Sequence, residues 1–227
     1  CSDWSEYFEQ VNRDETENRR FRDYLTINVS SFLRDPERWV TLQEEILPEL
    51  IKYKHNGRPS SGLKLWSAGC SIGAEPLSLV FRLDELNGKN SYYLVARDIG
   101  GGAMKFAADG GPYRKEDVKN LSPERLKRYF TASSAPFQVR SEYVNRVTFK
   151  ELDLINDPFE DQFDLIICRN VVIYFTADTK RVLFEKFRNA LRPGGILFVG
   201  GTEIIPQARE LGLKSTGISL YQRREES

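Results

Sequence analysis

The sequence is poor in the residues that metal sites and catalytic triads require. It contains one histidine, His55, and three cysteines that are far apart and form no Cys-x-x-Cys pair. A structural zinc site or a disulfide framework needs more of these residues at closer spacing. A Ser-His-Asp triad needs a better-placed histidine than one in a polar segment. We therefore expect no metal centre, no disulfides and no such triad, and cysteines of this kind indicate a cytoplasmic protein.

The chain also lacks an excess of charge of either sign and a long apolar run. Its 227 residues include 33 Lys and Arg against 33 Asp and Glu, so nothing global indicates binding to nucleic acid or to an anionic membrane. No apolar run approaches the roughly 20 residues of a membrane-spanning helix. A content of 40% hydrophobic and 29% charged residues is typical of a globular domain. We expect a monomer without membrane insertion.

From about residue 60, short apolar strands alternate with amphipathic helices. The apolar residues of 177–191 fall on one helix face, and 75–86 forms a second such helix. The predicted strands are 63–68, 91–98, 147–153, 163–170 and 194–201. This alternation predicts an α/β fold with a mostly parallel, doubly wound sheet.

Two segments stand outside this alternation. Residues 1–58 form a predicted N-terminal helical segment, with one helix over 37–52, and a loop rich in Gly, Pro and Ser separates it from the main domain, 59–227. Residues 110–146 contain a helix start at Ser122 followed by short strands and turns. We predict that this stretch is a small subdomain inserted between the second and third strands of the sheet.

Polar residues follow several predicted strands at their carboxyl ends. The first strand runs into Gly69 and Gly73, whose spacing differs from the Gly-x-Gly-x-x-Gly of dinucleotide-binding folds. Asp98 ends the second strand, where a carboxylate can accept hydrogen bonds from both ribose hydroxyls. Asp153 follows the third strand and Asn170 the fourth. Each residue alone could be a turn or cap residue, but together they predict one cleft.

Four segments resemble one known family, the CheR-type chemotaxis receptor (glutamate) methyltransferases. These segments are LTINVSSFLRD (25–35), WSAGCSIGAEPLSL (66–79), CRNVVIYF (168–175) and LRPGGILFVGGTE (191–203). The resemblance extends from about residue 20 to the end of the chain. It implies the Rossmann-like fold of class I S-adenosylmethionine-dependent methyltransferases, with a short N-terminal helical segment and a small inserted β-subdomain.

The resemblance also implies an activity. The chain would be a protein-glutamate O-methyltransferase that forms glutamate γ-methyl esters on the cytoplasmic domain of methyl-accepting chemoreceptors, with S-adenosyl-L-homocysteine as product. Arg34 and Tyr174 would lie nearest the methyl transfer. The cofactor-binding residues implied are Asn28, Ser30, Arg34, Gly69, Glu75, Asp98, Asp153, Leu154, Arg169 and Asn170.

The chain departs from the family pattern at a few positions. Ala74 and Leu77 replace a glutamate and a tyrosine of a Glu-Glu-Pro-Tyr run, and Arg97 replaces a small threonine. Asp153 stands where asparagine is common, and Gly201–Glu203 replaces a His-Ser-Glu-like ending. These departures concern substrate recognition more than cofactor binding, apart from the adenine contact of Asp153.

The implied chemistry suits a chain with one histidine. A glutamate side chain has an ordinary pKa near 4.3, so it is ionised at neutral pH and attacks without a general base. Two alternatives remain open from the sequence: a non-catalytic module that binds cofactor or receptor, and a methyltransferase acting on another carboxylate or a small molecule. The glycine spacing disfavours a nicotinamide-dependent dehydrogenase.

Overall fold

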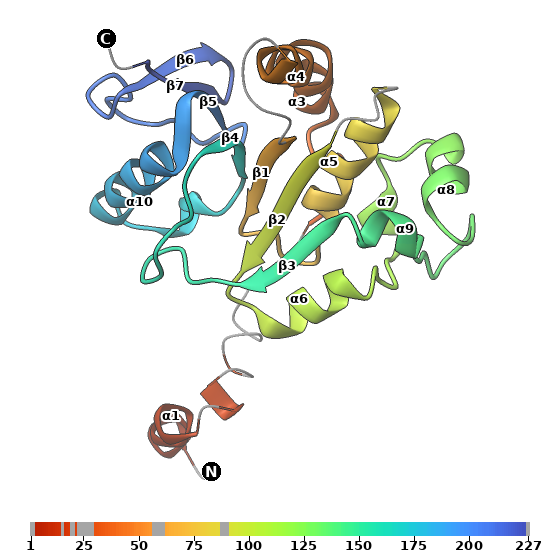
Figure 1. Cartoon of the computed structure of the whole chain (residues 1–227). Helices are drawn as coiled ribbons and strands as arrows, with labels where there is room; N and C mark the ends of the chain where they lie inside the picture. The colour runs from red at the N-terminus through yellow and green to blue at the C-terminus, as the bar shows by residue number, and fades with distance from the viewer. Residues whose placement is uncertain are drawn as a thin grey trace.

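The computed structural model describes residues 3–14, 16–18, 21, 30–55, 62–86 and 91–225. A seven-stranded sheet with the order β3-β2-β1-β4-β5-β7-β6 forms its centre (Figure 1). Its strands are β1 (Leu63–Ala68), β2 (Tyr92–Asp98), β3 (Val147–Glu151), β4 (Phe163–Cys168), β5 (Leu191–Val199), β6 (Leu213–Gly217) and β7 (Leu220–Arg223). The first five pair in parallel, and β7 runs antiparallel to both of its neighbours. The chain order reverses between β1 and β4, which is where open α/β sheets bind ligands.

The described chain contains several helices and helical turns, and those that pack on the sheet cover both of its faces (Figure 1). They are α1 (Trp4–Arg13), α3 (Pro36–Thr41), the π-helical turn η1 (Leu42–Ile46), α4 (Leu47–His55), α5 (Ala74–Glu85), α6 (Gly101–Ala108), α7 (Lys115–Val118), α8 (Pro123–Tyr129), α9 (Ser141–Val144), the 3₁₀ turn η2 (Val172–Tyr174) and α10 (Ala177–Ala190). Helix α10 lies on one side of the sheet and α5 on the other (Figure 1). The described helices include none long and apolar enough to cross a membrane.

Alternating side chains of the central strands build two cores. On β4, Leu165 and Ile167 join the core beneath α3 to α5, whereas Ile166 and Cys168 join the core beneath α10. Every residue of β4 is buried, as expected for a parallel strand covered on both faces. The doubly wound sheet predicted from the sequence is therefore confirmed.

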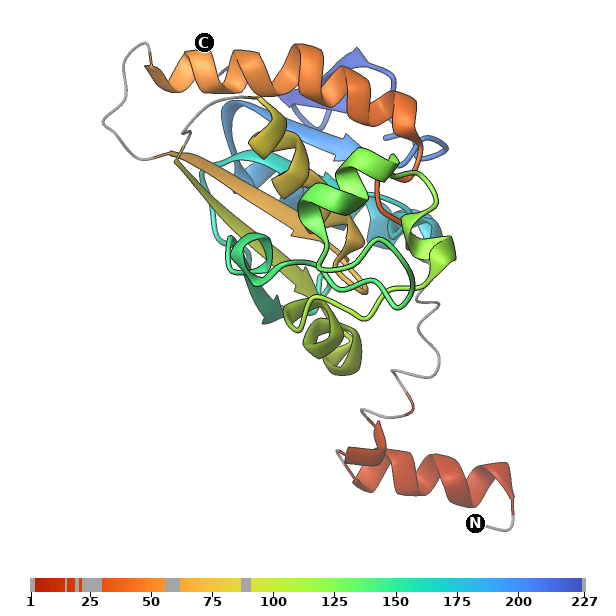
Figure 2. The same ribbon diagram turned by 90° about the vertical axis from the view of Figure 1, so that its right-hand side faces the viewer.

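The N-terminal helix runs further than predicted. Elements α3, η1 and α4 form one continuous rod beside the sheet (Figure 2), so the helix expected over 37–52 extends from Pro36 to His55. Pro48 cannot donate to a carbonyl one turn earlier, and the wider π turn just before it absorbs the mismatch. Trp39 and Leu47 are fully buried in the core of the sheet. The proposed boundary at residue 58 lies outside the described residues.

The inserted segment 110–146 differs from the expected β-subdomain. Its regular structure is helical (α7, α8 and α9), and its β pairing is limited to the isolated bridges Tyr113–Phe137 and Phe130–Val139. The reason is aromatic packing onto α5: the ring of Tyr129 stacks on Phe81 with centroids 4.0 Å apart. These side chains hold the segment against the main core, so it needs no sheet of its own.

The hairpin of β6 and β7 is absent from the sequence-based prediction. Strand β6 buries only Leu213 and exposes its other four residues, because it forms the edge of the sheet. An edge strand with one buried side chain has little of the apolar alternation that identifies a strand from sequence.

Candidate functional site

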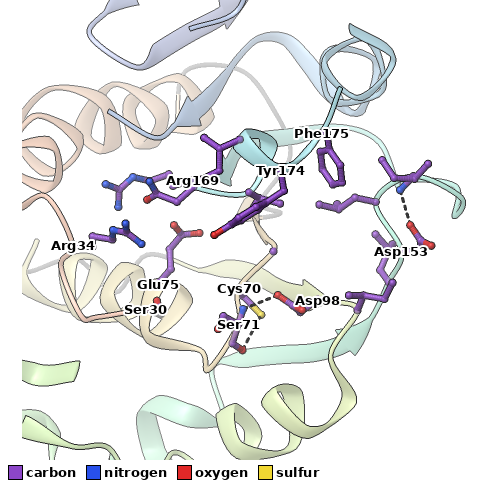
Figure 3. A pocket seen from close by; sticks show the side chains of 18 of the residues that line it. Ser30, Arg34, Cys70, Ser71, Glu75, Asp98, Asp153, Arg169, Tyr174 and Phe175 are labelled. Carbon is purple, nitrogen blue, oxygen red and sulfur yellow. Dashed lines mark hydrogen bonds between the residues drawn. The ribbon is translucent and has the colours of Figure 1, made fainter. Parts of the chain in front are cut away.

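A cavity of about 680 Å³ opens at the carboxyl ends of the parallel strands (Figure 3). Five stretches of chain line it: 30–39, 69–75, 98–99, 152–156 and 169–175. The predicted site residues that line it are Ser30, Arg34, Gly69, Glu75, Asp98, Asp153, Leu154, Arg169, Asn170 and Tyr174. Asn28 lies outside the described residues. The structure thus brings together nearly all of the predicted set, although it does not test their roles.

The N-terminal stretch enters the cavity through a strained turn. Leu33 and Asp35, on either side of Arg34, have left-handed φ angles of 48° and 56°. Such an angle is costly for leucine and more tolerable for aspartate, and it persists at Leu33 only when the surroundings hold it. Here the backbone N–H of Leu33 donates to Ser78 Oγ at 2.9 Å, and that of Phe32 donates to the carbonyl of Asp117 at 2.8 Å. The turn therefore presents Arg34 from a fixed backbone.

Charged groups gather at one end of the cavity. In Figure 3, Arg34, Glu75 and Arg169 lie at one end, and Asp153 and Phe175 lie at the other. Arg169 is buried and donates to Asp35 Oδ2 at 2.5 Å. Its Nε atom is also buried and has no hydrogen-bond partner in the described part of the chain. This end can therefore receive a ligand that carries one positive and one negative group.

Glu75 is the carboxylate of that end. It lies in the first turn of α5 and accepts a hydrogen bond from Ser67 Oγ at 2.7 Å. Burial raises the pKa of Glu75 to about 7, against the lowering effect of the Arg169 charge and the Ser67 hydrogen bond. A cationic ligand group would stabilise the ionised form of this buried carboxyl, because a nearby positive charge favours ionisation.

Asp98 lies in the middle of the cavity at the end of β2. Its Oδ2 accepts from the backbone N–H of Ser71 at 2.7 Å, and its Oδ1 accepts from that of Gly100 at 3.0 Å. A carboxylate has about four acceptor positions, so these two bonds fix Asp98 and leave it capacity for ligand hydroxyls. The facing turn reverses sharply at Gly69, with φ 73°, and at Ser71, with φ 49°.

Asp153 is held by several hydrogen bonds within its own loop. It lines the cavity, but its carboxylate folds back onto its own loop and accepts from the backbone N–H groups of Ile155 and Asn156 at 2.8 and 3.3 Å. The side chain of Asn156 donates to its other oxygen at 2.8 Å. These hydrogen bonds lower the pKa of Asp153 even though partial burial acts to raise it. Asp153 therefore shapes the loop.

The loop after β4 depends on a residue that the sequence reading did not assign to the site. Glu203 is buried, and its Oε2 accepts from the backbone N–H groups of Asn170 and Gly200 at 2.9 and 2.6 Å. Asn170 has a φ of 59°, and this bond holds it there. The signal available in the sequence was an acidic residue just past the last predicted strand, Gly201-Thr202-Glu203.

Tyr174 lies at the mouth of the cavity on η2. It is 61% exposed, and in Figure 3 its side chain points between the charged end and the opposite end. Ile99 and Ile155 also line the cavity and are partly exposed. Sequence reasoning missed these apolar residues because a lone isoleucine after a strand looks like core.

The arrangement suits an elongated ligand with three chemically distinct parts. The charged end matches a zwitterion, Asp98 matches a diol, and the apolar side chains near Leu154 match a flat ring. The two cysteines within the described residues, Cys70 and Cys168, do not add a nucleophile. Burial raises the pKa of the Cys70 thiol, with the nearby Asp98 charge acting in the same direction. Burial likewise raises the pKa of Cys168.

Comparisons with known proteins identify the family. The family model "CheR methyltransferase, SAM binding domain" matches residues 28–217. The chain is 35% identical over 218 residues to a chemotaxis protein methyltransferase of Listeria monocytogenes, covering 96% of this chain and 81% of that protein. It is 37% identical over 210 residues to chemotaxis protein methyltransferase 1 of Pseudomonas aeruginosa, covering 87% and 75%.

One further relative and one solved structure are less similar. A chemotaxis protein methyltransferase of Escherichia coli is 33% identical over 202 residues, covering 86% of this chain and 67% of that protein. The solved TehB-like SAM-dependent methyltransferase of Corynebacterium glutamicum is 15% identical, with a TM-score of 0.43 over 82% of this chain and 92% of that one. On the family match and the three chemotaxis relatives, this chain belongs to the CheR methyltransferase family and contains its S-adenosylmethionine-binding domain.

Proposed function

We propose that this chain transfers a methyl group from S-adenosylmethionine to the γ-carboxylate of glutamate side chains on the cytoplasmic domain of chemoreceptors. The relatives with 33–37% identity are named chemotaxis protein methyltransferases. The observation that carries the proposal is the cavity itself, in which an exposed tyrosine stands at the mouth beside a charged, partly buried end.

The residues of the cavity fit this cofactor part by part. Glu75 would accept the ammonium group of its methionine portion, and Arg169 would pair with its carboxylate. Asp98 retains acceptor capacity for the two ribose hydroxyls. The adenine ring would lie against Leu154 and its apolar neighbours. Gly69 would let the ligand approach the backbone closely, because it lacks a side chain.

Positioning accounts for most of the catalysis in this proposal. S-adenosylmethionine supplies a methyl group on a positively charged sulfur, so the acceptor carboxylate needs only to be ionised and aligned. Tyr174 would hold that carboxylate by one hydrogen bond. Arg34 would orient it without a bidentate pair, since a strong pair would stabilise the attacking oxygens and slow them. Correct alignment alone contributes a large share of the rate in such transfers.

The proposal predicts a base-labile product. Purified protein incubated with methyl-labelled cofactor and a chemoreceptor cytoplasmic fragment should yield label that mild alkali releases as methanol, because carboxyl esters hydrolyse where N-methyl and ether products do not. Tyr174→Phe removes one hydroxyl and should lower kcat by about tenfold or more while leaving S-adenosylhomocysteine affinity within about twofold.

Two outcomes would contradict the proposal. Label that survives alkali would indicate a different acceptor atom. An equal loss of turnover and cofactor affinity in Tyr174→Phe would place the hydroxyl on the cofactor and away from the acceptor.

A further inference from the structure

One loop of the cavity is held from outside the cavity by a single lysine. Lys186, a half-buried residue of α10, donates from Nζ to the backbone carbonyls of Leu154, Ile155 and Asp157 at 2.8, 2.9 and 2.9 Å. Its ammonium group also lies 4.2 Å from the centre of the Phe159 ring. An ammonium has three N–H donors, and here each has a carbonyl acceptor. The lysine is thereby committed to this loop.

The same loop is held at its other side by Asp153. The peptide between Leu154 and Ile155 points its carbonyl at Lys186 and its N–H at Asp153 Oδ1. In the next peptide, between Ile155 and Asn156, the carbonyl also accepts from Lys186 and the N–H also donates to Asp153 Oδ1. A peptide unit is planar, so hydrogen bonds at both of its ends prevent it from rotating. Two consecutive peptide planes are fixed in this way.

Further bonds close the turn and join it to the sheet. The backbone N–H of Asp157 donates to the carbonyl of Asp153 at 3.0 Å, and the side chain of Asp157 accepts from the N–H of Asp153 at 2.8 Å. The N–H of Leu152 donates to the carbonyl of Asp98 at 3.0 Å. The loop residues that line the cavity, Leu154 to Asn156, therefore project from a backbone with little freedom.

We propose that Lys186 is a positioning residue that fixes loop 153–157 and so sets the selectivity of the cavity for adenine over related bases. This inference rests on the proposed placement of the adenine ring beside Leu154. Hypoxanthine replaces the 6-amino donor of adenine with an acceptor and places a proton on the neighbouring ring nitrogen. Asn156 lines the cavity and donates from its side-chain nitrogen to Asp153 Oδ2 at 2.8 Å, so its side-chain oxygen is the acceptor that can meet the 6-amino group. A fixed loop cannot turn this acceptor into a donor for the reversed pattern, and buried polar groups left unpaired weaken binding strongly. A released loop can reorient.

The test compares two ligands on three proteins. Isothermal titration calorimetry would give the affinities of wild-type, Lys186→Met and Lys180→Met chains for S-adenosylhomocysteine and for its inosine analogue, S-inosylhomocysteine. Lys180 lies on the same helix, but its ammonium makes none of the contacts described above. Wild-type protein should prefer the adenine ligand by at least about a hundredfold, as expected for a site that leaves polar groups unpaired on mismatch. Lys186→Met should bind S-adenosylhomocysteine about tenfold more weakly and lose most of the preference, and Lys180→Met should match the wild type.

The possible outcomes separate this inference from the proposed function. The positioning role is overturned if Lys186→Met lowers the affinity for both ligands by the same factor or leaves both affinities unchanged. In either case, cofactor binding by the wild type would still support the proposed function. Wild-type protein that binds neither ligand overturns the cofactor placement and this inference with it. If Lys186→Met does not fold, Lys186→Arg decides: a planar guanidinium cannot serve three converging carbonyls as the ammonium does, so an intermediate preference supports the role and an unchanged preference overturns it.

Discussion

At the scale of the residue, the most informative group is the Glu75 carboxylate. It is reachable through the cavity but otherwise enclosed by protein, and burial raises its pKa to about 7 from the ordinary 4.5. The folded chain therefore binds more protons than the unfolded chain between these two pH values. As a result, the free energy of unfolding falls as pH rises through this window, because ionised Glu75 destabilises the folded chain. A ligand ammonium group beside ionised Glu75 would offset this loss of stability.

Glu75→Gln should accordingly be more stable than the wild type at pH 8, by about 1–3 kcal/mol, with water in the cavity screening part of the effect. Near pH 4.5 most of this advantage should vanish, because the wild-type carboxyl is then largely neutral in the folded chain. Thermal or urea unfolding at the two pH values measures this difference, with the exposed Glu142→Gln as control. A stability difference that does not change with pH would contradict the argument. The same variant should bind S-adenosylhomocysteine more weakly at pH 8.

Asp153, one of the departures from the family pattern noted in the sequence, is bonded within its own loop. A carboxylate accepts hydrogen bonds only, and here it accepts three within its own loop. The Asp153 carboxylate thus serves the geometry of its own loop, and the neighbouring side chains of Leu154, Ile155 and Asn156 line the cavity beside it.

At the scale of the element, a buried ion pair and a backbone hydrogen bond join three strands near their amino ends, opposite the end of the sheet that carries the cavity. Asp164 on β4 accepts from Arg192 Nε on β5 at 2.6 Å and from the backbone N–H of Lys64 on β1 at 2.8 Å. Both side chains are almost fully buried. The pair therefore links β5 to β1 and β4, two strands whose opposite ends lead into cavity-lining loops.

Asp164→Ala should destabilise the fold by about 3–5 kcal/mol, because it leaves the Arg192 charge buried without its partner. Adding Arg192→Met should recover part of this loss, since the double variant no longer buries a lone charge. Urea unfolding of the two single variants and the double variant measures the coupling. Strictly additive losses would show that the pair does not act as a unit.

At the scale of the whole molecule, the cavity depends on stretches of chain that are far apart in sequence. Residues 69–75, 98–99, 152–156 and 169–175 meet because the strand order places β1, β2, β3 and β4 side by side. Residues 30–39 join them through hydrogen bonds to Ser78 and Asp117. A ligand that spans the cavity should therefore order these stretches together.

Hydrogen exchange with and without saturating S-adenosylhomocysteine tests this expectation. Backbone amides of residues 30–35, 69–75, 152–156 and 169–175 should exchange more slowly together in the presence of ligand. Those of the β6–β7 hairpin, which does not line the cavity, should change little, since edge strands exchange through local opening. Protection confined to one stretch would contradict a shared ligand site.

The sequence by itself determined the alternating α/β pattern, the end of β2 at Asp98, the presence of Asn170 just after β4, and the family. These features depend on local periodicity, on polar residues at fixed places and on motifs that can be read along the chain. Only the tertiary structure decided that 110–146 packs as helices on α5, that Asp153 turns into its own loop, and that Glu203 and Lys186 hold the loops of the cavity. Each of these contacts joins residues distant in sequence or depends on the direction of a side chain, and periodicity in the sequence does not specify either one.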